Sequence, residues 1–396
     1  MSLKMNVTIL LAAILQFGVM RATGVESLPV EAPAGDRVVE RRTNWQVEPS
    51  FKYDALCLIN VLSGDPFYLW HYAKAYTDFF PKLTAEAKAA VANLKRIIKD
   101  QGGGIISAQL CLFFSASDDE TLDQMIATLD RPETLKDRFA RTPYWSEASW
   151  DRFMSIRGDL ATVLNWYKSI ELENHWRVNV RPVAAARAEE MLAEVAAFNI
   201  VPLIEQHLGR PLESETITVY MLTYSQPHGI KITGTRFLTD VAWPFQTVVR
   251  NAVHEMMHPP YTLAGDAELR AVLDAISKDA FLMNKVENHN PLFGYNTLEG
   301  FVEEDCVQAL EQLINEQLGI AEDAARRWAK SDDGMHVLAV ALYRLMKEEK
   351  YPSKDGSIRD FLIRMNHEGR LVEGSVQMHH RAMYTVDKQD DGRTRP

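Results

Sequence analysis

Three residues in the stretch VVRNAVHEMMHPPYTL (248–263) have the types and spacing needed for metal chemistry. His254 and His258 are four positions apart, so on a helix their imidazoles lie on one face, one turn apart, and can bind the same ion. Glu255 adjoins the first histidine, where its carboxylate can take a proton from metal-bound water. The pattern predicts a catalytic Zn2+ site. The alternative is a structural role for two histidines near the negative end of a helix dipole.

A catalytic zinc site usually has three protein ligands, so one more is expected from another part of the chain. The helix predicted downstream of the motif carries Glu299, Glu303 and Glu304. Glu299 and Glu303 flank the expected buried stripe of that helix, so one of them is predicted to bind the metal and the other to orient a histidine. Glu304 shares a face with Glu311 that looks solvated, and it becomes a ligand only if the helix is rotated. A solvated acidic face is the alternative for all three glutamates.

Hydrolysis at such a site also needs a donor for the oxyanion that forms during the reaction. Tyr295, Tyr261 and His228 are the candidate donors, and Tyr295, just ahead of the glutamate-bearing helix, is the one predicted to be catalytic beside Glu255. An ordinary packing or surface role is the alternative for each of these three residues, and for His289, His379 and His380.

Two predicted strands and a helix have to position the motif. Residues 215–224 are β-branched and aromatic, and residues 230–241 continue that pattern with an interruption at Gly234. Pro244 suits the first turn of the helix that follows. Two prolines after His258 are predicted to end that helix at His258 itself.

The rest of the chain reads mostly as helix. Apolar residues recur every three or four positions through much of the range 51–210, which is predicted to be a helical N-terminal region. The predicted fold class is α+β, predominantly helical, with a small sheet whose edge strand precedes the motif helix. Further helices are expected at 264–284, 296–317, 321–331, 334–349 and 357–367.

The first residues have the order of a secretory signal peptide. Lys4 precedes an apolar run from Val7 to Met20, and small residues follow at Ala22 and Gly24. The run is shorter than the roughly 20 residues that a membrane-spanning helix needs. The sequence predicts a signal peptide at 1–24, a secreted or periplasmic protein with no stable membrane insertion after its removal, and a linker at 25–50.

Composition excludes some classes of partner. The net charge is −11 across 396 residues, and no long basic run exists, so a nucleic-acid partner is not expected. Cys57, Cys111 and Cys306 each lie among apolar neighbours, which predicts buried free thiols rather than a disulfide framework or a cysteine zinc site.

The motif and the glutamate-bearing helix together resemble a known group. HEMMH followed by LEGFVEE is similar to the zinc metallopeptidases that use a glutamate ligand (gluzincins), whose aminopeptidase members carry that glutamate in a stretch of the type NEGFA; the match here is Glu299, Gly300 and Phe301. The resemblance implies a zincin-like domain at 211–396, with His254, His258 and Glu299 as ligands and Glu255 as general base. It also implies that IKITGTRFL is an edge strand that pairs with the substrate backbone.

The predicted function is zinc-dependent hydrolysis of peptide bonds in an exported peptide or protein substrate, with water activated by Glu255. Two alternatives stay open. The same site could hydrolyse amides that are not peptides, or the protein could be an exported, non-catalytic binding protein on the same fold.

Overall fold

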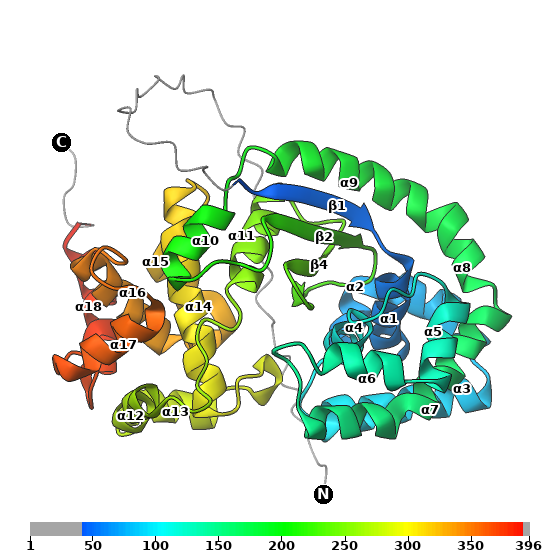
Figure 1. Cartoon of the computed structure of the whole chain (residues 1–396), viewed down its shortest axis with the longest axis horizontal. Coiled ribbons are helices and arrows are strands. Elements are labelled where there is room, and N and C mark those ends of the chain that lie inside the picture. The colour runs from blue at the N-terminus through cyan, green and yellow to red at the C-terminus, as the bar shows by residue number, and fades with distance from the viewer. Residues whose placement is uncertain (1–41, 391–396) are drawn as a thin grey trace, which may run out of the picture.

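The computed structural model describes residues 42–390 of the chain (Figure 1). It is mostly helical with one small mixed sheet, which confirms the predicted α+β class in its broad form. The predicted signal peptide at 1–24 and most of the predicted linker lie outside the described residues. Within residues 42–390, no helix has both the length and the apolar character needed to cross a bilayer.

The sheet has four strands in the order β1-β2-β4-β3. β1 (Asn44–Pro49), β2 (Thr216–Leu222) and β4 (Arg236–Asp240) are parallel, and β3 (Ile230–Lys231) pairs with β4 in the antiparallel sense. β1 corrects the linker prediction for 25–50, because its residues pair with β2 over their whole length. The polar, alternating sequence of β1 fits a half-buried edge strand.

The predicted strand at 230–241 is in fact two strands. Residues 232–235 turn between β3 and β4, and Gly234 adopts a left-handed backbone conformation (φ 70°) that glycine tolerates without strain. This turn reverses the chain, so β3 lies antiparallel on the edge of the sheet opposite β1.

The N-terminal helical region precedes β2 in sequence, as predicted for residues 51–210. Its core is a cluster of buried side chains that also takes in one face of the sheet. Its helices are α1 (Phe51–Leu62), α2 (Pro66–Phe79), α3 (Ala85–Leu94), α4 (Ile106–Phe114), α5 (Leu122–Asp130), α6 (Glu133–Phe139), α7 (Glu147–Ser169) and α8 (Leu172–His175), followed by α9 (Arg181–Val195) and α10 (Val201–Leu208).

The second half of the chain contributes the helices after the sheet. The predicted single helix at 264–284 is two helices, because Asp279 accepts hydrogen bonds from the backbone N–H groups of Phe281 and Leu282 and starts a new helix there. The helices are α11 (Phe245–Met256), α12 (Ala267–Ile276), α13 (Ala280–Asn288), α14 (Leu298–Gln317), α15 (Ala324–Lys330), α16 (Val337–Glu349), α17 (Ile358–His367) and α18 (Ser375–Asp390).

The sheet separates two hydrophobic cores. Successive side chains of a strand point to opposite faces. On β4, Phe237 accordingly joins the core of the C-terminal helices and Leu238 joins that of the N-terminal helices. α9 and α10 pack into the C-terminal core, although the sequence groups them with the N-terminal region. Figure 1 shows the two helical groups on either side, with α9 running alongside β1.

Candidate metal centre

α11 carries the first two residues of the motif. Its apolar residues recur at helical spacing and are buried, so the helix packs on the sheet and on α14. His254 and Glu255 lie in its last turn. The helix ends at Met256, two residues earlier than predicted, and His258 follows in the loop that leads to the two prolines. A helix end near these prolines is expected from their effect on the residues before them.

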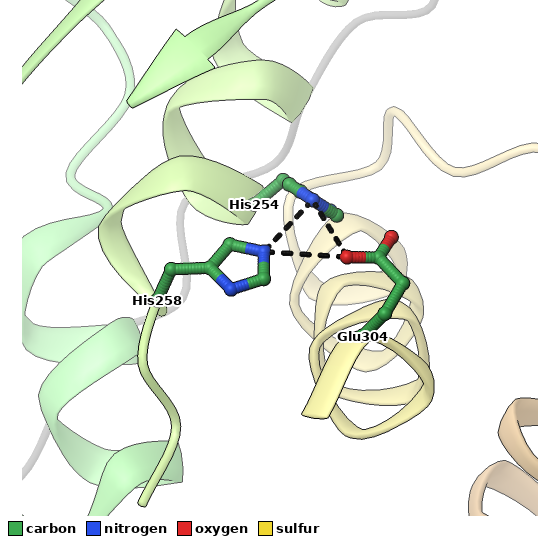
Figure 2. Close-up of side chains that lie close together, drawn as sticks. All are labelled: His254, His258 and Glu304. Atoms are coloured by element: carbon green, nitrogen blue, oxygen red, sulfur yellow. Dashed lines mark hydrogen bonds and ion pairs between the residues drawn. The ribbon is translucent and has the colours of Figure 1, made fainter. Parts of the chain in front are cut away.

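The carboxylate that meets the two histidines belongs to Glu304. His254, His258 and Glu304 are the one group of three potential ligands among the described residues whose ligand atoms all lie within 4.8 Å of one another. The Nε2 atoms of the two histidines are 3.2 Å apart. Glu304 Oε2 lies 3.4 Å from His258 Nε2 and 3.7 Å from His254 Nε2. Figure 2 shows the three side chains converging on one point.

These distances fit a bound divalent metal. Zinc binds histidine nitrogen and carboxylate oxygen at about 2.0–2.1 Å, and tetrahedral angles then separate two ligand atoms by about 3.3 Å. Glu304 Oε2 is buried and accepts no hydrogen bond from the described residues. A buried carboxylate oxygen without a donor is costly, and a cation would compensate it. The three residues can therefore hold one metal ion.

The position of Glu304 corrects the order of the glutamates predicted from the sequence. The prediction treated one stripe of α14 as buried, but α10, α11, α12, α13 and α16 pack around this helix, so its acidic side chains are buried as well. Glu304 and Glu311, expected to be solvated, are 3% and 6% exposed. The physical reason is the central position of α14, which no periodicity within its own sequence reveals.

Glu299, the ligand implied by the resemblance to the NEGFA stretch, does not join this group. Its carboxylate lies on the first turn of α14 and pairs with Arg270 Nη1 at 3.1 Å, and its side chain is 52% exposed. Glu303 does not join the group either, but its Oε1 atom lies 3.3 Å from His258 Nδ1. Glu303 thus lies where a residue that orients His258 is expected, and Glu299 lies in neither of the two predicted positions.

Each histidine has a second carboxylate behind it. His254 Nδ1 lies 3.1 Å from Glu311 Oε2, as His258 Nδ1 lies near Glu303. When Nδ1–H donates to these carboxylates, both Nε2 lone pairs are free for a metal, and the rings are held in orientation. Arg327 on α15 pairs with Glu311 at 2.6 Å and balances its charge.

The electrostatics of the site favour a cation. Burial alone would lower the pKa of His258, but the hydrogen bond to Glu303 and the negative charge of Glu304 outweigh burial and raise the pKa to about 10. Burial tends to raise the pKa of Glu311, but Arg327 and then His254 outweigh it and lower the pKa to about 2. Several ionised carboxylates thus surround two imidazoles, and a divalent cation would neutralise them.

A cavity of about 440 Å³ opens beside the metal-binding group. It is lined by His254, Glu255 and His258, by Tyr295, and by residues 229–231 at the start of the edge strand. A Cβ atom at position 229 would lie 3.3 Å from Glu255 Oε1 and 3.1 Å from Asn251 Nδ2. Gly229 therefore allows the edge strand to pass close to Glu255.

Tyr295, the oxyanion donor predicted from the sequence, lines the same cavity as Glu255. Burial of its hydroxyl, followed by the negative charge of Glu304, raises the pKa of this phenol well above its ordinary value. The hydroxyl therefore keeps its proton and can donate a hydrogen bond inside the cavity.

The weaker candidates lie away from the cavity lining. Tyr261 has a buried hydroxyl without a hydrogen-bond partner among the described residues. His228 forms a hydrogen bond with the Tyr68 hydroxyl at 3.1 Å. The ring nitrogens of His289 lie within hydrogen-bond distance of the backbone carbonyls of Lys285 and Gly294. His379 and His380 lie on the last helix, where His380 packs on Phe281.

Three residues at the site were not predicted from the sequence: Glu311, Tyr144 and Lys231. Glu311 appeared solvated, and Tyr144 lies about 110 positions before the motif, in the loop between α6 and α7. Tyr144 lines the cavity, where burial and then the charge of Glu255 raise its pKa. Lys231 on β3 also lines it; burial lowers the pKa of Lys231 to about 8, while its Nζ donates to the Gly234 carbonyl at 2.6 Å. For Lys231 the sequence contained one hint, because charged residues are common on short edge strands.

Comparison with known proteins gave no match among family models, curated proteins or solved structures. The assignment of the site rests on its own geometry.

Proposed function

We propose that this protein is a zinc-dependent hydrolase of peptide bonds. The observation that carries the proposal is the convergence of His254 Nε2, His258 Nε2 and Glu304 Oε2 beside a cavity that also contains Glu255. Two histidines and one carboxylate, with room for a fourth ligand, are typical of catalytic rather than structural zinc sites. The arrangement supports the resemblance to gluzincins in its ligand types, with Glu304 in place of the implied Glu299.

Different residues of the chain can assist different steps of hydrolysis. Bound zinc would supply Lewis acidity, which polarises a carbonyl and makes water more acidic. Glu255 lines the cavity next to a ligand, so its carboxylate can accept a proton from the attacking water and pass it to the leaving amine. The Tyr295 hydroxyl can donate to the oxyanion as the carbonyl carbon becomes tetrahedral.

The edge strand favours a peptide over other amides. The N–H of Ile232 donates to the carbonyl of Arg236 on β4. Because backbone groups alternate in direction along an antiparallel strand, the N–H and C=O of Lys231 point to the open side of β3. An extended peptide can pair with these groups, and residues 229–231 line the same cavity as Glu255.

A peptide library tests the proposal. Purified protein with one equivalent of zinc is incubated with mixed peptides, and new termini are identified by mass spectrometry. We expect cleavage that a chelator abolishes, that added zinc restores, and that Glu255→Gln reduces by about 10²–10⁴-fold. Glu299→Gln is the matched control and should cleave normally.

Other outcomes select the alternatives. Zinc binding without cleavage of any peptide, but with release of amine from simple amides, would indicate a hydrolase of non-peptide amides. A protein that takes up no zinc and cleaves nothing would overturn the proposal in favour of a binding protein.

A further inference from the structure

One wall of the cavity comes from α4, far from the motif in sequence. Positions 108, 109 and 112 of this helix lie three, four and seven positions after Ile105, the residue that precedes the helix, so the four side chains lie on one side of it. They are only partly buried, whereas the rest of the helix packs into the N-terminal core. This face is directed at the cavity that contains His254 and Glu255.

The chemistry of this wall is apolar. α4 and α6 give the cavity one amide and otherwise only aliphatic and aromatic groups, and Phe113 and Phe139 are almost fully buried beneath it. The residues that form the wall are Ile105, Ala108, Gln109, Leu112, Phe113 and Phe139.

The open edge of β3 borders the same cavity, and α4 packs against β3. A peptide paired with Lys231 would direct alternate side chains away from the plane of the sheet. One of them would enter the space beside α4, next to the metal-binding group. An apolar side chain that is removed from water in this space would strengthen the binding of the peptide.

We propose that the N-terminal helical region forms a specificity subsite for a large apolar side chain adjacent to the bond that is cleaved. The inference rests on the proposed function, because it assigns the substrate class of that same site. Ala108 lies in the middle of the wall, and its small side chain leaves the space that the substrate side chain occupies.

Blocked hexapeptides of glycine and alanine that differ only at one central position (Phe, Ala or Asp) are the probes. Binding to the Glu255→Gln protein is measured by calorimetry, and cleavage by the unaltered protein is measured as kcat/KM. We expect the Phe peptide to exceed the Ala peptide by at least about tenfold in both measurements, with the Asp peptide weakest.

Two variants examine the wall itself. Ala108→Phe fills the space and should remove the preference for the Phe peptide. Leu112→Ala removes a contact without adding bulk and should weaken that preference. Ala92→Phe on the exposed side of α3 is the control and should preserve it. Melting temperatures establish that each variant is folded.

The outcomes separate the two proposals. Tighter binding of the Phe peptide that Ala108→Phe abolishes, without any cleavage, would leave the subsite standing and overturn the hydrolase. Cleavage without a preference for Phe, or a preference unchanged in both wall variants, would overturn the subsite and leave the hydrolase standing. Failure of all three peptides to bind would also overturn the subsite.

Discussion

Glu304 and Glu311 lie seven positions apart on α14 and serve the same histidine, one from each side. Glu304 Oε2 faces Nε2 of His254, and Glu311 Oε2 faces Nδ1. His254, Glu255 and His258 lie close together in the sequence, so their spacing alone could predict a metal site. Glu304 could not be chosen from its helix, because its burial depends on other helices packed around it.

Glu311→Gln should weaken zinc binding by about 10–100-fold. The amide cannot supply the negative charge that holds the Nδ1 proton of His254, so the ring loses both orientation and basicity. Zinc affinity is measured by competition with a chromophoric chelator. Glu316→Gln on the same helix is the control, since Glu316 pairs with Lys347 instead. Equal affinities in the two variants would contradict the orienting role.

Tyr295→Phe should lower kcat by about 10²–10³-fold while the metal content stays unchanged. The variant removes one donor to the oxyanion but no metal ligand. Tyr261→Phe, which removes another buried hydroxyl near the site, should cleave normally. A change confined to KM would show that Tyr295 binds substrate without assisting the reaction.

At the scale of elements, boundaries set by local chemistry could be predicted and those set by tertiary contacts could not. The helix at 357–367 is observed as Ile358–His367, because Ser357 caps it. The helix expected at 264–284 is broken, because the carboxylate of Asp279 also accepts from Val376 N–H on α18, which ties α13 to the end of the chain. Apolar residues recur at helical spacing through both helices, so the sequence pattern does not predict that break.

A buried ion pair joins α14 to α16. His336 Nδ1 bonds to Asp305 at 2.6 Å and Nε2 bonds to Asp332 at 2.9 Å. Burial alone would lower the pKa of His336, but the charge and hydrogen bonds of Asp305 and then Asp332 outweigh burial and raise the pKa from 6.5 to about 10. The folded protein therefore holds this proton at pH values where the unfolded chain releases it.

The free energy of unfolding should fall as the pH rises from about 6.5 towards 10, because in this range the folded state binds a proton that the unfolded state has released. The slope is at most about 1.4 kcal/mol per pH unit for one group. Urea unfolding at pH 7 and pH 9 measures this change in the free energy of unfolding. His336→Gln should be less stable at pH 7 and should show a shallower decline. Parallel declines in the two proteins would contradict the assignment of the proton to His336.

At the scale of the whole molecule, the metal centre and the proposed substrate wall belong to different cores. His254 and Glu304 lie on α11 and α14 of the C-terminal core, and His258 lies just after α11. α4 lies in the N-terminal core, with the sheet between the two cores. The sequence predicted both helical parts and the sheet. It could not predict that α4 and the motif line one cavity, because their residues lie more than 140 positions apart in the sequence.

Zinc should stabilise the C-terminal core more than the N-terminal core. A ligand present at about 1,000 times its Kd stabilises the folded state by about 4 kcal/mol. Hydrogen exchange with and without zinc should show greater protection in α11 and α14, and smaller changes in α3 and α7. Uniform protection, or none, would indicate that the metal does not join α11 to α14.

The most direct test of the metal centre is the zinc content of three proteins after loading and dialysis: the unaltered chain, Glu304→Gln and Glu299→Gln. The account predicts one equivalent in the unaltered chain and in Glu299→Gln, and a large loss in Glu304→Gln. No zinc in the unaltered chain, or full retention in Glu304→Gln with loss in Glu299→Gln, would contradict it.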